Sequence, residues 1–320
     1  MKIVILDGGV LNPGDLSWTR LEQLGEIQVY ENSAPEEVVE RIGRAEIAIV
    51  NKVSLGRKEF ERCPELRFIG VTATGYNNID LAAAGNQGIA VANVPTYGTV
   101  TVAQFTTSLM LELCNHVGEH ALDVRAGGWS RKTDFCYWLK PMIEVADKSV
   151  GIIGFGRIGQ AFGMVAQALG MKVLAYDEHR DLSLENERVR YVDLDTLYAQ
   201  ADIISLHCLL TGKTQGMINA AAIGKMKKSV LILNASRGDL VNEADLAAAL
   251  NSGRVAGAAV DVLSQEPPSP DNPLLSARNC LVTPHIAWAS VEARGRILAI
   301  TADNVKAFIN GHPQNRVDTL

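Results

Sequence analysis

The sequence has few of the features that mark secreted, membrane or nucleic-acid-binding proteins. Its five cysteines are odd in number and form no C-x-x-C pair, which argues against a disulfide framework. No stretch approaches the roughly 18 consecutive apolar residues of a membrane-spanning helix. The opening residues, MKIVILDGG, are too short an apolar run for a signal peptide and are typical of a first strand. We therefore expect a cytoplasmic protein without a membrane partner.

Positive charge is also scarce. Lysine and arginine total 30 against 36 acidic residues, the net charge is −6, and no basic run occurs. Nucleic acid is therefore not expected as a partner. The chain does have 320 residues of which 47% are hydrophobic, enough for about two globular domains.

A dinucleotide-binding pattern lies in the middle of the chain. The apolar run 149–153 leads into GFGRIG, residues 154–159, and then into apolar residues at helical spacing. A second apolar run, 172–176, ends on Asp177. A G-x-G-x-x-G motif between a strand and a helix, with an acid after the next strand, is the βαβ fingerprint of nucleotide-binding domains. The alternative, a glycine-rich turn in an ordinary α/β domain, explains less of this context.

Each residue of the pattern has a separate physical reason. Gly154 permits a sharp turn, Gly156 lets the backbone approach a pyrophosphate, and Gly159 lets the helix pack closely on the sheet. The helix N-terminus offers N–H donors to the phosphates. Asp177 can accept hydrogen bonds from ribose hydroxyls and repels a 2′-phosphate, which favours NAD over NADP. Arg180 argues the other way, because an arginine there could partner that phosphate.

Apolar runs alternate with helical segments on both sides of the fingerprint, which predicts two parallel, doubly wound α/β sheets. The runs before it are 3–6, 27–30, 47–50, 68–71 and 89–94; those after it are 189–192, 203–207, 229–234, 255–260 and 280–283. Between the two sets, residues 99–125 have helical spacing throughout and predict one long helix. We assign residues 1–98 and 288–320 to a substrate domain and 99–287 to a dinucleotide-binding domain.

Three chemically suited side chains follow strands of the second sheet, at the edge where ligands bind in such folds. Arg237 could bind a carboxylate as a fork of donors. His285 could exchange a proton near neutral pH, and Glu266 could stabilise its imidazolium and fix its tautomer. Each also has an ordinary explanation: a surface arginine, an acid capping a proline turn, and a core histidine. Their shared placement favours a joint site for reduction of a 2-oxo acid.

The segments that carry these residues resemble the D-isomer-specific 2-hydroxyacid dehydrogenase family over essentially the whole chain. The resemblance rests on GFGRIG with Asp177, NASRGDLVNEADLAAAL (234–250), AVDVLSQEP (259–267) and TPHIAWAS (283–290). It implies a flavodoxin-like substrate domain, a Rossmann NAD-binding domain and a homodimer. It also implies that Arg237 binds substrate, that His285 is the acid/base and that Glu266 assists it.

Further site residues follow from the resemblance alone. NAD contacts are implied for Gly154, Gly156, Arg157, Ile158, Gly159, Asp177, His207, Cys208, Thr214, Ala235 and Asp261. Asp261 is expected near the nicotinamide carboxamide. Substrate contacts are implied for Ala73, Thr74, Gly75, Arg237 and Trp288, and for Trp138 supplied by the partner subunit. Interface packing is an equally good explanation of Trp138. In the segment SLHCLLT (205–211), Leu209 stands where the family usually has proline.

VTATGYNNIDL (71–81) and HIAWAS resemble the glycerate dehydrogenase, or hydroxypyruvate reductase, branch of the family. The resemblance implies reduction of hydroxypyruvate to D-glycerate, or of glyoxylate to glycolate. A D-lactate or 3-phosphoglycerate dehydrogenase is the alternative within the family. An NAD(H)-sensing corepressor is the alternative outside enzymes, although no basic surface or peptide-docking signature supports it.

One group of residues outside this site has a spacing typical of metal ligands. Glu112, His116 and His120 recur at four-residue intervals on the predicted long helix, a spacing compatible with metal ligation. They lie away from the strand ends, so we expect a solvated helix face and no metal.

Overall fold

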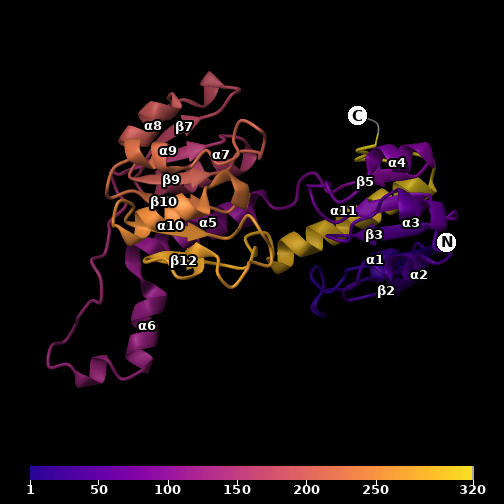
Figure 1. Cartoon of the computed structure of the whole chain (residues 1–320), viewed down its shortest axis with the longest axis horizontal. Helices are drawn as coiled ribbons and strands as arrows, with labels where there is room; N and C mark the ends of the chain where they lie inside the picture. Colours follow the sequence, from indigo (N-terminus) through magenta and orange to yellow (C-terminus); the bar gives the residue numbers. More distant parts are fainter. Residues whose placement is uncertain (319–320) are drawn as a thin grey trace. The chain divides into compact units, whose positions relative to one another are not determined.

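The chain folds into two compact units in the computed structural model, which describes residues 1–318 (Figure 1). Unit 1 comprises Met1–Gly98 and the described residues from Trp288 onward, and unit 2 comprises Thr99–Ala287. Each unit is built on its own parallel sheet, which confirms the predicted fold class. Within the described residues, no helix is long and apolar enough to cross a membrane.

Unit 1 contains a five-stranded parallel sheet in the order β2-β1-β3-β4-β5, the flavodoxin-like order. Its strands are β1 (Lys2–Ile5), β2 (Glu26–Val29), β3 (Ile47–Val50), β4 (Phe68–Val71) and β5 (Ala90–Ala92). Its helices are α1 (Thr19–Glu22), α2 (Val38–Ile42), α3 (Arg57–Arg62), α4 (Leu81–Asn86) and α11 (Val291–Ile309). Every residue of β3 and β4 is buried, as expected for central strands covered on both faces.

Helix α11 returns the end of the chain to unit 1. Ser290 caps its N-terminus by accepting a hydrogen bond from Ala293 N, and its buried face packs on β4. Phe308 stacks on Phe68 of that strand, with ring centroids 4.8 Å apart. Packing of this helix explains why residues so far apart in sequence form one unit.

Unit 2 contains a seven-stranded parallel sheet in the order β12-β11-β10-β9-β6-β7-β8. Its strands are β6 (Ser149–Ile153), β7 (Lys172–Tyr176), β8 (Val189–Tyr191), β9 (Ile203–Leu206), β10 (Leu231–Asn234), β11 (Gly257–Val260) and β12 (Cys280–Val282). Its helices are α5 (Thr99–Asn115), α6 (Val117–Arg125), α7 (Arg157–Ala168), α8 (Leu194–Gln200), α9 (Ala220–Lys225) and α10 (Glu243–Asn251). The strand order reverses beside β6, so the glycine motif that follows β6 lies at the point where such sheets bind nucleotides.

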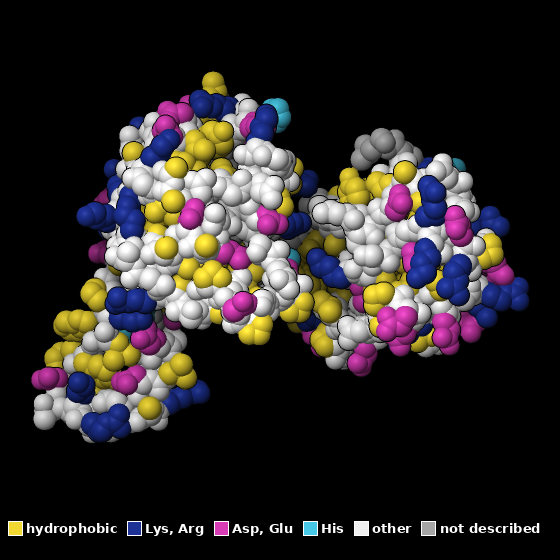
Figure 2. All heavy atoms as spheres, viewed as in Figure 1, with side chains coloured by type: hydrophobic (Ala, Val, Ile, Leu, Met, Phe, Trp, Pro, Cys, Tyr) yellow, Lys and Arg dark blue, Asp and Glu magenta, His cyan; other side chains and the backbone are white. Residues whose placement is uncertain are grey.

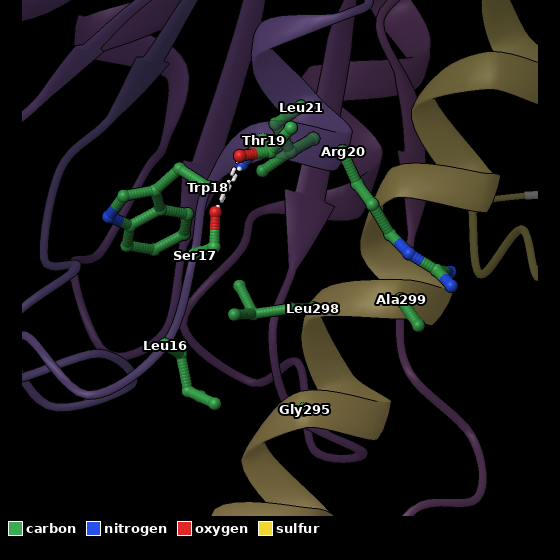
Figure 3. A pocket seen from close by; sticks show the side chains of 9 residues that line it. All are labelled: Leu16, Ser17, Trp18, Thr19, Arg20, Leu21, Gly295, Leu298 and Ala299. Atoms are coloured by element: carbon green, nitrogen blue, oxygen red, sulfur yellow. Dashed lines mark hydrogen bonds between the residues drawn. The ribbon is translucent and has the colours of Figure 1, made fainter.

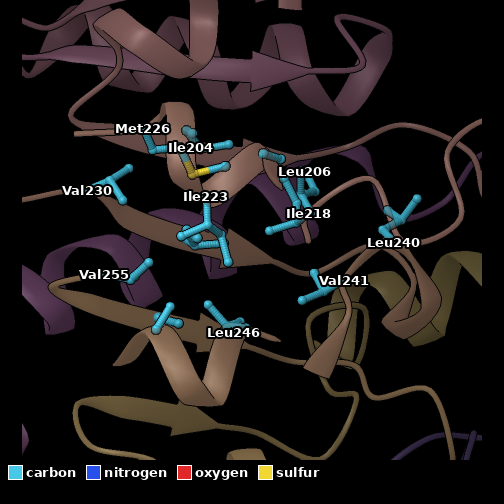
Figure 4. Close-up of a cluster of buried hydrophobic side chains, with 14 of the residues drawn as sticks. Ile204, Leu206, Ile218, Ile223, Met226, Val230, Leu240, Val241, Leu246 and Val255 are labelled. Atoms are coloured by element: carbon cyan, nitrogen blue, oxygen red, sulfur yellow. The ribbon is translucent and has the colours of Figure 1, made fainter. Parts of the chain in front are cut away.

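Apolar side chains fill both faces of this sheet. On one face, residues of β9 meet side chains of α9 and α10, among them Ile204, Ile223 and Leu246 (Figure 4). On the other, Met110 of α5 and Phe162 of α7 pack with the strands. Burial of each such side chain stabilises the fold by about 1.5–3 kcal/mol, and together they hold the strand ends in place.

The prediction of one unbroken helix over residues 99–125 was wrong. His116 adopts a left-handed conformation with φ of 51°, which ends α5 and starts α6 in a new direction. Glu112 accepts a hydrogen bond from Gly118 N, which stabilises the turn. Helical spacing on both sides of the break hid it in the sequence.

Candidate active site

The three motif glycines have different surroundings in the structure. Gly154 has φ of +92°, and a Cβ there would lie 2.4 Å from the backbone N of Cys208. A Cβ on Gly159 would lie 2.2 Å from the carbonyl oxygen of Gly154. A Cβ on Gly156 would meet nothing within 4 Å. Backbone packing therefore requires two of the glycines, and the third leaves open space at the start of α7.

That open space fits a dinucleotide pyrophosphate. Gly156 is the N-cap of α7 and provides no side chain to accept from the helix N–H groups. Arg157 is exposed and Ile158 is half-buried in the first turn. The N–H groups of the first turn and the helix dipole suit an anion, so the donor set matches the phosphates of NAD.

Asp177 joins the glycine loop to the end of β7. Its Oδ2 accepts a hydrogen bond from Phe155 N at 2.8 Å, and its Oδ1 accepts one from His179 N at 2.9 Å. Each carboxylate oxygen can accept a second bond, so ribose hydroxyls can still be bound. Arg180, the alternative partner of a 2′-phosphate, donates to the Val192 carbonyl oxygen at 3.4 Å.

Replacement of Asp177 is expected to change cofactor preference. Asp177→Ala should raise KM for NADH and lower KM for NADPH by roughly tenfold, because a repulsive charge beside the 2′-phosphate is lost. Asp177→Asn is the matched variant, since it removes the charge but keeps an acceptor for Phe155 N. Steady-state kinetics with both cofactors measure the change. If the NADH to NADPH preference stays the same in both variants, Asp177 does not bind the ribose.

The side chains of His207, Cys208 and Thr214, predicted to contact NAD, each have a partner within the protein. His207 Nε2 lies 2.8 Å from Ser205 Oγ, and its ring packs on Phe162 at a centroid distance of 5.5 Å. Cys208 Sγ lies 3.8 Å from the sulfur of Met217. Thr214 Oγ1 donates to the Leu209 carbonyl within its own turn. The backbone of residues 207–208 borders Gly154. Side-chain contacts with NAD stay a prediction for His207, Cys208 and Thr214.

Burial lowers the pKa of His207 to about 4. The unfolded chain takes up this proton near pH 6.5, so between these values the unfolded state binds more protons than the folded state. The free energy of unfolding should therefore fall as the pH is lowered through this window, by at most about 1.4 kcal/mol per pH unit from this group. Thermal denaturation between pH 7 and pH 4.5 measures the slope. His207→Gln should flatten it, and the exposed control His312→Gln should not; equal slopes in all three proteins would contradict this role.

Arg237, Glu266 and His285 follow the carboxyl ends of β10, β11 and β12, and the last two are in contact. His285 Nδ1 lies 2.6 Å from Glu266 Oε2, and the two side chains are 30% and 35% exposed. The other carboxylate oxygen of Glu266 accepts from Leu263 N at 3.0 Å. Glu266 is thus anchored on one side and fixes the histidine ring on the other.

Arg237 is linked to the same loop through its neighbour. A Cβ on Gly238 would lie 1.9 Å from the carbonyl carbon of Leu263, so the two backbones approach as only glycine allows. Asn234 holds the turn by donating from Nδ2 to the Arg237 carbonyl at 2.8 Å. The Arg237 side chain is exposed, with Nη1 donating to the Ser236 carbonyl. Ala235, half-buried, begins this turn.

Asp261, predicted to lie near the nicotinamide carboxamide, also has a structural role within the protein. It is 1% exposed, and its carboxylate accepts hydrogen bonds from Thr283 Oγ1, Ile286 N and Ala287 N at 2.6–2.9 Å. Its carbonyl accepts from His285 N, and His285 has φ of 55°. Asp261 therefore holds the turn that presents the histidine. The sequence signal was present, an acid at one strand end and T-P-H at the next, but it did not distinguish the two roles.

In unit 1 the predicted carboxylate loop, Ala73 to Gly75, follows β4. Thr74 Oγ1 donates to the Val94 carbonyl at 2.9 Å, and Val94 N donates to the Ala73 carbonyl. The buried Asn93 donates from Nδ2 to the Thr74 carbonyl at 2.8 Å. The loop is thus tied to the end of β5 along its length.

The two predicted tryptophans have different environments. Trp288 packs in unit 1 beside Tyr97, with ring centroids 6.5 Å apart in a T-shaped pair, and contacts the apolar cluster around Ile297. Trp138 is 62% exposed. It lies in an arm, which we define as α6 and the following residues 126–147, that projects from the rest of unit 2 (Figure 1).

The arm carries large apolar side chains on its surface. α6 has no buried residue, and hydrophobic side chains gather on the arm in Figure 2. The exposed members are Val117, Leu122, Val124, Trp129, Phe135, Trp138, Leu139 and Met142. Exposed apolar patches of this extent are typical of protein interfaces.

Glu112, His116 and His120 stabilise the base of the arm. His120 Nδ1 lies 2.7 Å from the His116 carbonyl oxygen, and its Nε2 accepts from Leu139 N at 3.0 Å. Both ring nitrogens of His120 are therefore occupied, and all three residues are half-buried, so the face expected to be solvated is partly exposed. Within residues 1–318, no group of three or more His, Cys, Asp or Glu side chains has a metal-binding arrangement.

A small recess in unit 1 offers no comparable chemistry. It encloses about 190 Å³ between α1 and α11 and is lined mainly by apolar side chains such as Leu16, Trp18 and Leu298 (Figure 3). Arg20 is the one ionisable residue of its lining. The strand ends, where arginine, glutamate and histidine converge, remain the better candidate.

The chain is similar to known proteins in sequence and in fold. The family model described as D-isomer specific 2-hydroxyacid dehydrogenase, NAD binding domain, matches residues 107–287. The chain is 54% identical to a hydroxypyruvate reductase of Blautia hydrogenotrophica, over 99% of this chain and 100% of that protein. It is 43% identical to a glycerate dehydrogenase of Methylorubrum extorquens, over 99% of each. 

A solved structure with the same fold is the NAD-complexed D-isomer specific 2-hydroxyacid dehydrogenase of Lactobacillus delbrueckii ssp. bulgaricus. It matches with a TM-score of 0.82 and 25% identity, over 99% of this chain and 100% of that chain. The glycine loop, the acid after β7 and the histidine–glutamate pair agree with these likenesses. The chain belongs to the D-isomer specific 2-hydroxyacid dehydrogenase family and carries its NAD-binding domain.

Proposed function

We propose that this enzyme reduces hydroxypyruvate to D-glycerate, with glyoxylate to glycolate as a second reaction. The observation that carries the proposal is the 2.6 Å contact of His285 with Glu266, in the same unit as Arg237 and the glycine loop. The names of the relatives that are 54% and 43% identical support this choice of substrate.

Different residues bind the substrate, donate the proton and position the proton donor in the proposed reduction. When bound at the glycine loop, NADH supplies the hydride that the carbonyl carbon accepts. Arg237 binds the substrate carboxylate as a fork of donors. Glu266 accepts from His285 Nδ1–H, which leaves the Nε2 proton for the carbonyl oxygen as its negative charge develops. Asp261 keeps the histidine in position.

A panel of 2-oxo acids tests the substrate. We expect NADH oxidation with the highest kcat/KM for hydroxypyruvate, a lower value for glyoxylate, and much lower values for pyruvate and phosphohydroxypyruvate. A higher kcat/KM for pyruvate or for phosphohydroxypyruvate would identify that acid as the substrate and contradict the proposal. NADH binding without turnover of any acid would instead indicate a sensor.

We also propose that the cytoplasmic protein is a homodimer assembled through the arm, with Trp138 at or near the partner's site. The exposed apolar surface of the arm supports an obligate partner, and a second copy offers the same surface. Light scattering should give a dimer for the wild type and monomers for Leu122→Glu combined with Phe135→Ser. A wild-type monomer at micromolar concentration would contradict the proposal.

A further inference from the structure

Prolines limit the backbone hydrogen bonds of the loop that carries Glu266. We call residues 262–272, between β11 and the short helix η4 (Pro273–Leu275), the Glu266 loop. Its residues 267, 268 and 270 are prolines, which have no N–H group to donate. Contacts from other segments are therefore needed to fix this loop.

The carboxylate of Glu243 makes two of these contacts. Glu243 is the first residue of α10 and is half-buried. Its Oε1 accepts a hydrogen bond from Ser264 N at 2.6 Å, and its Oε2 accepts one from Asn272 Nδ2 at 2.8 Å. Hydrogen bonds to an ionised acceptor are roughly twice as strong as neutral ones. One carboxylate thus holds the Glu266 loop on both sides of Glu266.

Asn272 connects this carboxylate to the core of unit 2. Its Oδ1 accepts from Leu274 N at 3.0 Å and caps η4, and Leu274 is 1% exposed within the apolar core. The amide therefore uses its acceptor on η4 and its donor on Glu243, which fixes its orientation. The later end of the Glu266 loop is held between α10 and the core.

The bond to Ser264 lies next to the anchor of Glu266. Leu263 N donates to Glu266 Oε1 at 3.0 Å, and Ser264 follows directly in the chain. A Cβ on Gly238 would lie 2.3 Å from Ser264 N, so the turn after β10 packs on the same peptide. A displacement of this peptide would therefore move Glu266, the residue that orients the acid/base histidine.

We propose that Glu243 is a positioning residue for the reduction, because it fixes the Glu266 loop and so holds Glu266 against His285; this inference rests on the proposed function. Glu243 acts through Ser264 and Asn272, not on the substrate. The alternative is that Glu243 only stabilises the start of α10, where an acidic side chain interacts favourably with the helix dipole. Loss of positioning lowers kcat, whereas loss of helix stabilisation lowers the melting temperature alone.

Exchange of donor and acceptor between Glu243 and Asn272 tests the proposal. Glu243→Gln places a second donor against Asn272 Nδ2, and Asn272→Asp places a second carboxylate against Glu243 but still caps η4. We expect each single variant to lower kcat by roughly tenfold, because small displacements of catalytic groups are costly, and to change KM for NADH less than about twofold. The double variant restores one donor facing one acceptor, so its kcat should return to within about threefold of wild type.

Glu292→Ala is the matched control, since it removes an exposed glutamate from the first turn of another helix, α11. Its kcat should equal that of the wild type. Full kcat in both single variants would overturn the proposal, as would a double variant no more active than the singles. A lower melting temperature with unchanged kcat would assign Glu243 to helix stability alone.

A spectroscopic readout separates this inference from the proposed function. Nitrogen chemical shifts of the His285 ring, measured by NMR at alkaline pH through its carbon-bound protons, report which nitrogen carries the proton. We expect the Nδ1–H tautomer in the wild type, a mixture of tautomers in each single variant, and the Nδ1–H tautomer again in the double variant. Identical shifts in all four proteins would overturn the inference, whether or not they reduce a 2-oxo acid. A wild type that reduces no 2-oxo acid would contradict the proposed function only.

Discussion

His285→Ala is expected to lower kcat for reduction by about 100-fold or more, the usual contribution of a positioned acid. The loss should appear in kcat because the proton is transferred to the carbonyl oxygen only as charge develops there. NADH binding should be retained, since the glycine loop and Asp177 are formed by other segments. Stopped-flow fluorescence of bound NADH and steady-state turnover separate the two quantities.

Two variants sharpen this test. His312→Ala changes an exposed histidine in unit 1 and should have no effect on turnover. Glu266→Gln keeps the shape of the side chain but removes its charge, so kcat for reduction should fall, because the protonated His285 loses its anionic partner at 2.6 Å. Near-normal turnover of His285→Ala would remove the histidine from the mechanism.

Arg237→Met is expected to lower kcat/KM for the 2-oxo acid by roughly 100-fold, since hydrogen bonds to a charged group contribute about 1.5–3 kcal/mol. The Arg237 side chain is exposed, and Asn234 holds the Arg237 backbone. The substitution therefore removes hydrogen-bond donors without disturbing the turn. Initial-rate kinetics with saturating NADH measure the effect.

Arg237→Lys is the matched control because it keeps the charge but not the planar fork. We expect it to recover only a small part of the activity, since a lysine cannot bind a carboxylate in the bidentate manner. Full activity of the lysine variant would show that charge alone is needed. Unchanged kcat/KM in the methionine variant would mean that another group binds the carboxylate.

Much of the fold follows from short-range patterns in the chain. Strictly apolar runs such as 47–50 and 68–71 predicted buried parallel strands, and the structure has β3 and β4 there. The glycine motif has physical consequences that one sequence displays: a positive φ at Gly154 and a close approach at Gly159. Candidate catalytic residues at strand ends could be predicted from the sequence in the same way, because parallel strands place their carboxyl ends at one edge of the sheet.

Contacts between segments that are distant in the sequence could not be predicted from the sequence. The left-handed His116 breaks a pattern that is helical on both sides, because its conformation depends on the capping contact of Glu112 with Gly118. Asp261 and Asp7 both follow strands and look like ligand-binding acids, yet each is buried and satisfied by backbone donors of other loops. Which acid faces a ligand and which holds a loop depends on the tertiary structure.

The most direct test of the account is to incubate the purified protein with NADH and hydroxypyruvate and to measure both NADH consumption and the chirality of the product. The account predicts one D-glycerate formed for each NADH oxidised, in a reaction that His285→Ala nearly abolishes. Formation of L-glycerate, or binding of NADH without oxidation by any short 2-oxo acid, would contradict it.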